Sequence, residues 1–151
     1  MSSEEPGVRQ GCRFCAIVNG ELEANLVLED ANTLAFLDNR PLFPGHSLLV
    51  PRNHVDTLAD LPDEVLPELF ANARLLARAM ESGLGSEGSF VAINNRVSQS
   101  VPHLHVHVAP RTKGDGLRGF FWPRQKYRDE AHVAETERAL RETVERLRAE
   151  G

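Results

Sequence analysis

The sequence predicts an α+β domain with an antiparallel sheet of about five strands, one long helix and a C-terminal helix. Five short apolar runs are typical of strands, a longer segment between the third and fourth runs has helical periodicity, and the C-terminal segment carries a second apolar seam. An antiparallel sheet with its helices mainly on one face leaves the other face free for a functional site.

The first elements are strands. The predicted strands are Asn25–Glu29, Thr33–Asp38, Ser47–Pro51, Ser89–Asn94 and His103–Ala109. The polar residues between the first two runs are typical of a hairpin turn, and a Pro-Gly pair before the third run is a further turn signal.

The long helix follows the third strand, with apolar residues three and four positions apart over 66–80. Residues 62–64 favour a helix start. Pro67 does not suit a helix interior, so we expect a later start or a distorted first turn. Gly83 and Gly85 predict the end of this helix.

The second helix is predicted from about Asp129, with a narrow seam formed by Val133, Leu140, Val144 and Leu147. We therefore expect a flexible N-terminal segment over residues 1–11 and the main domain over 12–128. The helix over 129–151 is expected to pack on this domain or to extend it.

Composition limits the range of functions. A chain of 151 residues that is 41% hydrophobic fits one domain with a real core. It has no apolar run of 18 residues and begins with a polar segment, so we expect a cytoplasmic protein without a membrane anchor. The net charge of −5 disfavours broad nucleic-acid binding, although residues 111–128 carry six basic side chains and one acid.

The most informative segment is the last predicted strand, which contains His103, His105 and His107. Because side chains alternate across a strand, all three imidazoles should project from one face. Leu104, Val106 and Val108 should then pack under a helix on the other face. Neutral imidazole is a good nucleophile near pH 7, and neighbouring imidazoles can donate hydrogen bonds to phosphoryl oxygens.

This segment, His-Leu-His-Val-His-Val-Ala-Pro-Arg over 103–111, resembles the signature of the histidine triad (HIT) family, closest to its Hint-like branch. The resemblance extends over most of residues 12–111. Similar segments occur in the family's order at 12–15, 34–38 and 45–54, followed by Asn94 and Gln99–Val101.

The resemblance implies a nucleotide hydrolase or nucleotidyl transferase that cleaves at the α-phosphate of a purine nucleotide. His105 would form a covalent nucleotidyl intermediate. His107 would hydrogen-bond the phosphate, Ser100 would assist the leaving group, and His46 would support the site. The expected nucleotide-binding residues are Asp38, Asn94, Gln99 and His107. A homodimer is also implied, and phosphoramidates or dinucleoside polyphosphates are the expected substrates.

The sequence departs from the family pattern at two places. The linker 95–98 is shorter and lacks the usual glycines, and Arg96 adds a cation near the expected phosphate path. Asn39 stands where the family often has an apolar residue near the base. The leaving group and the preferred base are therefore open.

Cys12 and Cys15 have the CxxC spacing of a zinc-chelating pair, although a redox pair or two packed thiols would have it too. Some HIT proteins complete such a site with histidines that match His54 and His103. The resemblance therefore implies a structural zinc held by Cys12, Cys15, His54 and His103, and no organic cofactor.

The basic and aromatic segment after the triad has two interpretations. Phe121 or Trp122 could stack on a base while Lys113 or Arg118 meets a distal phosphate. Alternatively, the aromatic residues close the core or a dimer interface.

Other functions remain open at this stage. Two of the triad histidines could hold a catalytic metal in a metal-dependent hydrolase, although no carboxylate is evident near the strand. The chain could also be a non-catalytic nucleotide-binding protein on the same fold, or a thiol redox protein based on its cysteine pair.

Overall fold

The computed structural model describes residues 7–117 and 124–151. Residues up to Asp115 form one compact unit, and residues from Gly116 onward form a second. Within the described ranges, no helix combines the length and the hydropathy that crossing a membrane requires.

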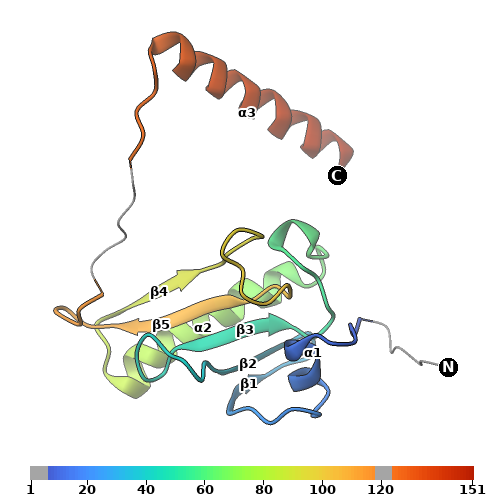
Figure 1. Ribbon diagram of the computed structural model, residues 1–151, viewed down its shortest axis with the longest axis vertical. Helices are drawn as coiled ribbons and strands as arrows, with labels where there is room; N and C mark the ends of the chain where they lie inside the picture. Colours follow the sequence, from blue (N-terminus) through green and yellow to red (C-terminus); the bar gives the residue numbers. More distant parts are fainter. Residues whose placement is uncertain (1–6, 118–123) are drawn as a thin grey trace. The chain divides into compact units, whose positions relative to one another are not determined.

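The first unit is built on a five-stranded antiparallel sheet in the order β1-β2-β3-β5-β4 (Figure 1). The strands are β1 Leu26–Glu29, β2 Thr33–Leu37, β3 Ser47–Pro51, β4 Gly88–Ala92 and β5 Val106–Arg111. This confirms the predicted fold class and number of strands.

Four of the five predicted strands differ from the structure by one to three residues at an end, and the largest difference is at the last strand. The last strand begins at Val106 rather than at His103, because pairing with β3 starts at Val106 and Leu49. The backbone before Val106 forms hydrogen bonds outside the sheet. The Leu104 N–H donates to the Val55 carbonyl, and the His103 N–H donates to the Val101 carbonyl.

The predicted long helix is α2, Leu66–Leu84, which begins after residues 62–64 rather than within them. Pro67 lies in its first turn, where a missing N–H costs no intrahelical hydrogen bond. Gly85 ends the helix with a left-handed φ of 70°. The core under α2 is formed by Ala35, Leu49, Leu69, Ala73, Leu76, Met80, Leu104, Val106 and Val108.

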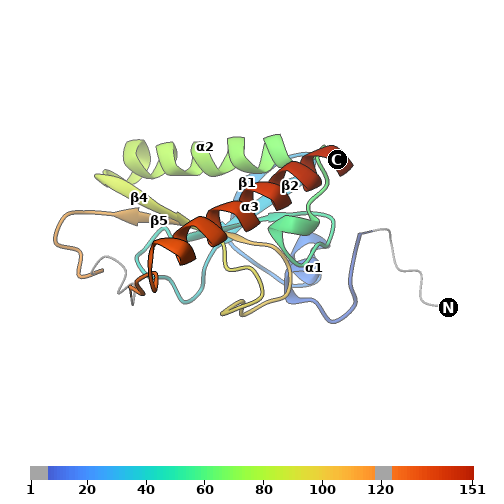
Figure 2. The ribbon, with the colours of Figure 1, turned by 90° about the horizontal axis from the view of Figure 1, so that it is seen from above.

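A short helix not expected from the sequence, α1 Arg13–Val18, lies on the opposite side of the sheet from α2 (Figure 2). The Cys12 thiol caps it by accepting a hydrogen bond from the Cys15 N–H. Its apolar partners come from β2 and β3 and alternate with those under α2; the cluster is Phe14, Ile17, Leu34, Phe36, Leu48 and Val50. The face expected to be free therefore carries a helix.

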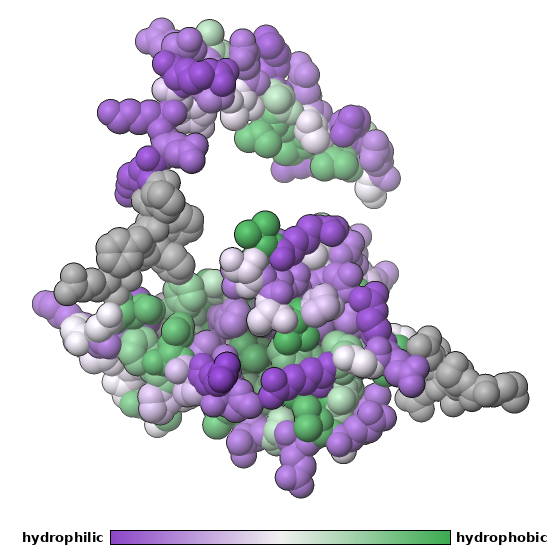
Figure 3. All heavy atoms as spheres, viewed as in Figure 1, coloured by the Kyte–Doolittle hydropathy of each residue, from purple (hydrophilic) through white to green (hydrophobic). Residues whose placement is uncertain are grey.

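Two further helices complete the described chain. Leu58–Asp60 forms a 3-10 turn, η1, in the first unit. The second unit contains α3, Glu130–Glu150, which Asp129 caps through a hydrogen bond from the His132 N–H. No residue of α3 is buried, and its predicted apolar seam is visible in Figure 3.

Candidate functional site

The triad lies on the α1 side of the sheet. His107 is opposite Leu48 in the β3–β5 register, and Leu48 packs with the α1 cluster. Val106 and Val108 point into the core under α2, as the predicted alternation requires. His105 and His103 precede β5, but the ring contact of His105 with Phe14 places it on the same side.

The hydrogen bonds of His105 define which ring nitrogen is nucleophilic. Its Nδ1 lies 2.8 Å from the His103 carbonyl oxygen. Because a carbonyl only accepts, the neutral ring carries its proton on Nδ1 and has a lone pair on Nε2. The ring packs edge-on against Phe14 and His107, with centroids 5.1 and 4.9 Å away, and only 2% of the residue is exposed. Phe14, which the sequence did not single out, therefore orients this ring.

His46 and His107 form a second directed pair. The Leu42 N–H donates to His46 Nδ1 at 3.0 Å, so the proton of a neutral His46 must be on Nε2. That nitrogen is 3.1 Å from His107 Nδ1. His107 Nδ1 then accepts, and its Nε2–H remains available as a donor.

Both histidines of this pair are held neutral. Burial lowers the pKa of His107 to about 4, and the neighbouring His105 and His46 add to the effect. Burial also lowers the pKa of His46, although the nearby Asp38 opposes this shift. Neutral rings are what the hydrogen-bond chain from Leu42 to His107 requires.

Asp38 follows β2 and lies beside the His46–His107 pair. Its Oδ2 is 3.8 Å from His46 Nδ1, and its Oδ1 accepts a hydrogen bond from the Arg40 N–H. The expectation that no carboxylate lies near the histidines is therefore wrong, because β2 and β3 are neighbours in the sheet. Asp38, His46 and His107 place potential ligand atoms within 4.8 Å of one another.

The loop after β4 carries the remaining predicted site residues. Asn94 and Ser100 are exposed there. The Gln99 amide donates to the Asp56 carbonyl at 2.6 Å and accepts from the Arg96 N–H at 2.9 Å. These bonds tie the loop to the segment after His54.

Two residues of this loop have an unusual backbone conformation. Arg96 and Ser98 both have left-handed φ values, 69° and 60°, a conformation that glycine adopts more readily. The loop is therefore under local backbone strain at both residues.

A second cluster lies at the N-terminal side of the triad. The shortest contacts join Cys15 Sγ to His54 Nδ1 at 3.3 Å and Cys12 Sγ to His103 Nδ1 at 3.4 Å, with Cys15 Sγ 3.6 Å from His103 Nδ1. All four side chains bring a ligand atom within 4.8 Å of the others.

This cluster fits tetrahedral zinc. Zn–S bonds of about 2.3 Å and Zn–N bonds of about 2.0–2.1 Å would place sulfur and nitrogen ligands about 3.5 Å apart. The outer nitrogens of both histidines are also engaged, because His103 Nε2 donates to the Pro51 carbonyl at 2.9 Å and His54 Nε2 lies 2.8 Å from Asp56. These contacts turn both Nδ1 atoms toward the thiols, as metal-ligating histidines require.

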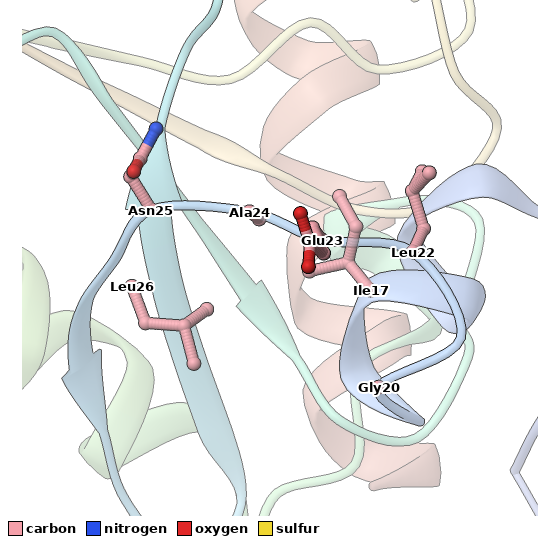
Figure 4. Close-up of a pocket in the computed structure, with 7 residues that line it drawn as sticks. All are labelled: Ile17, Gly20, Leu22, Glu23, Ala24, Asn25 and Leu26. Atoms are coloured by element: carbon pink, nitrogen blue, oxygen red, sulfur yellow. The ribbon is translucent and has the colours of Figure 1, made fainter.

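A hollow of about 550 Å³ lies beside the site, between the end of α1 and the segment leading into β1 (Figure 4). Ile17 and Gly20 line one side, and residues 22–26 line the other. The Leu37 N–H donates to the Asn25 carbonyl, so the hollow lies next to the end of β2, directly before Asp38.

The aromatic and basic tail is only partly described. Arg118, Phe121 and Trp122 lie outside the described residues. Lys113 lies in a turn where its backbone N–H donates to Glu87.

A family model described as the HIT domain matches residues 19–114. Three curated relatives support this match. An uncharacterized HIT-like protein of Methanocaldococcus jannaschii is 40% identical, with 70% of this chain and 82% of the relative covered. The adenylylsulfatase of Arabidopsis thaliana is 33% identical over 76% and 59% of the two chains. The adenosine 5′-monophosphoramidase of Saccharomyces cerevisiae is 34% identical over 76% and 72%.

Solved structures share the fold. A Streptococcus mutans protein has a TM-score of 0.83 at 29% identity, with 95% of this chain and 91% of the other covered. A zinc-bound histidine triad family protein from Mycobacterium smegmatis has a TM-score of 0.68 at 38% identity, over 85% and 97% of the two chains.

Proposed function

The chain belongs to the HIT-domain family, and from this premise we propose that it hydrolyses or transfers nucleotides through a nucleotidyl-His105 intermediate. Relatives with nucleotide hydrolase activity support the general reaction class. The observation that carries the proposal is the 2.8 Å contact between His105 Nδ1 and the His103 carbonyl oxygen, which favours the tautomer with Nε2 free to attack.

In the proposed first step, His105 Nε2 attacks the α-phosphate and the bond to the leaving group breaks. The His107 Nε2–H donates to a phosphoryl oxygen as negative charge builds there, while His46 keeps His107 in the donating tautomer. Ser100 assists the departing group. Water then cleaves the Nε2–P bond and releases the nucleoside monophosphate.

The hollow beside α1 is the best place for the nucleoside of a purine nucleotide. Asp38 directly follows Leu37, which binds the Asn25 carbonyl, and it would accept hydrogen bonds from the ribose hydroxyls. Apolar Ile17 and Leu22, together with polar Glu23 and Asn25, suit the faces and the edges of a base. Asn94 and Gln99 are the remaining residues proposed to line the phosphate-binding part of the site.

The decisive experiment measures AMP release from adenosine 5′-phosphoramidate. We expect wild type and the control His132→Ala, changed in α3, to release AMP. His105→Ala should lose activity by at least about a thousandfold while remaining folded. Equal release by wild type and His105→Ala would overturn the nucleophile assignment.

We also propose that the four-residue cluster binds a structural zinc ion, which would crosslink α1 to the backbone around the triad. Metal analysis should find about one zinc per chain in wild type and a strong loss in Cys15→Ser. Asp38→Asn, which changes the other cluster, should keep the metal. Equal zinc in Cys15→Ser and wild type would contradict the assignment.

A homodimer through β4 is the proposed assembly. β4 is an edge strand of the sheet, and Val91 on it is 47% exposed. Leu66, Phe70 and Leu75 on α2 are also at least 40% exposed. Exposed apolar side chains on the last strand of the sheet and on α2 favour contact with a second copy.

One observation favours a metal-dependent hydrolase as a second candidate, namely the group of Asp38, His46 and His107. The hydrogen bonds weigh against it, because Leu42 occupies His46 Nδ1 and Arg40 engages Asp38. A chelator separates the two candidates. Folded, chelator-treated enzyme that still forms a covalent adenylyl-protein excludes the catalytic metal, whereas complete loss of chemistry in folded protein would favour it.

A further inference from the structure

A groove of about 290 Å³ runs between the N-terminal segment and the loop before the triad. One wall is formed by residues 9–13, which include the proposed zinc ligand Cys12, and the other by Ser100, Val101 and Pro102. A second proposed zinc ligand, His54, also lines the groove. Sites that hold an entire drug-sized ligand usually span roughly 300–1,000 Å³. This groove therefore suits one part of a substrate.

The charges in the groove have one sign. Two arginines line it and no carboxylate does. Arg9 pairs with Asp56 at 3.0 Å, so its charge is partly compensated. Arg13 is exposed, and none of its contacts within residues 7–117 and 124–151 is an ion pair. Its guanidinium is available for an anion.

The groove is connected to the nucleophile through Cys12, which lines it. Cys12 Sγ lies 3.4 Å from His103 Nδ1, and the His103 carbonyl oxygen lies 2.8 Å from His105 Nδ1. Ser100, the residue proposed to assist the leaving group, also lines the groove. Its neighbour Gln99 is fixed by hydrogen bonds with the Arg96 N–H and the Asp56 carbonyl.

We propose that this groove is a leaving-group subsite that binds an oxyanion, either the sulfate of a nucleoside phosphosulfate or the distal phosphates of a polyphosphate, mainly through Arg13. The inference rests on the proposed function. As the His105 Nε2–P bond forms, the bond from phosphorus to the bridging oxygen breaks. The leaving oxyanion takes the electron pair into the groove. Water then cleaves the Nε2–P bond and yields the nucleoside monophosphate and a proton.

The test compares kcat/KM for three substrates: adenosine 5′-phosphosulfate, diadenosine tetraphosphate and adenosine 5′-phosphoramidate. Arg13→Gln should reduce the value for the two oxyanion substrates about tenfold more than for the phosphoramidate. Arg13→Lys should restore part of the difference. Arg74→Gln, an exposed change on α2 at the opposite side of the sheet, should leave all three values unchanged.

A binding measurement tests the subsite independently of catalysis. Inorganic pyrophosphate and sulfate, titrated separately, should bind wild type more tightly than Arg13→Gln, and the tighter anion identifies the natural leaving group. Equal losses for all three substrates, or unchanged anion binding in Arg13→Gln, would overturn the inference. Failure of the proposed function looks different: no substrate releases AMP, or release survives His105→Ala.

Discussion

At the scale of single residues, the position of protons on three histidines decides what the site can do. A backbone carbonyl holds the proton of His105 on Nδ1, and a backbone N–H holds the proton of His46 on Nε2. Because both partners belong to the backbone, side-chain substitutions elsewhere leave these tautomers in place. His46 is thus a positioning residue for His107.

Substitutions at His46 should affect turnover more than substrate binding. His46→Leu removes the donor to His107 Nδ1, and kcat should fall about 10- to 100-fold with a smaller change in KM. His46→Gln offers an amide N–H and should recover part of the loss. Steady-state kinetics with adenosine 5′-phosphoramidate would measure this. Equal kcat in His46→Leu and wild type would exclude the positioning role.

The pKa of His107 makes stability depend on pH. The pKa is about 4 in the folded chain and about 6.5 when the histidine is unfolded. Between these values the unfolded chain binds a proton that the folded chain excludes. The free energy of unfolding should therefore fall as the pH falls from about 6.5 to 4.

Urea denaturation at several pH values would measure this dependence. His107→Gln should have a shallower pH dependence than wild type. His132→Gln, changed in α3, should retain the wild-type slope. The same slope in wild type and His107→Gln would assign the dependence to other groups.

At the scale of elements, local periodicity was enough to predict that the five strands and the two long helices exist and in which order they occur. Ser47–Pro51 has the predicted bounds, and α3 begins one residue after its predicted start at about Asp129. The six-residue α1 is too short for a periodic signal, and its cap is a cysteine thiol rather than a usual capping residue. The start of β5 depends on which partners the backbone finds, which no pattern within residues 103–109 reveals.

The strained loop gives a prediction at this scale. Ser98 has a φ of 60°, where a β-branched residue is strongly disfavoured. Ser98→Val should destabilise the protein by about 1–2 kcal/mol, whereas Ser98→Gly should be close to neutral. Thermal unfolding of both variants would check this. Similar melting temperatures for Val and Gly would mean that the loop relaxes freely.

At the scale of the whole molecule, the triad could be predicted from spacing, but its surroundings could not. The roles of Asp38, His46 and the four proposed zinc ligands came from family resemblance, since these residues span positions 12 to 103 and meet only through the fold. The contacts of Phe14 and Arg13 depend on α1, so they became visible only with the fold.

The proposed dimer is tested at the same scale. Val91→Lys would place a charge at the β4 edge and should weaken dimerisation at least about tenfold. Val97→Lys, in an 81% exposed loop position, is the matched control and should remain dimeric. Light scattering over a dilution series would measure this. A wild type that is monomeric at high concentration would refute the assembly.

The register between β3 and β5 has a consequence for how such a chain can diverge. Leu48 lies opposite His107, and His46 comes directly before β3. A two-residue slip would keep every side chain on its own face, yet it would move His46 about 7 Å along the strand from its partner. Insertions in these two strands should therefore be eliminated by selection even when the chain still folds. Insertions and deletions should instead accumulate in the connecting loops.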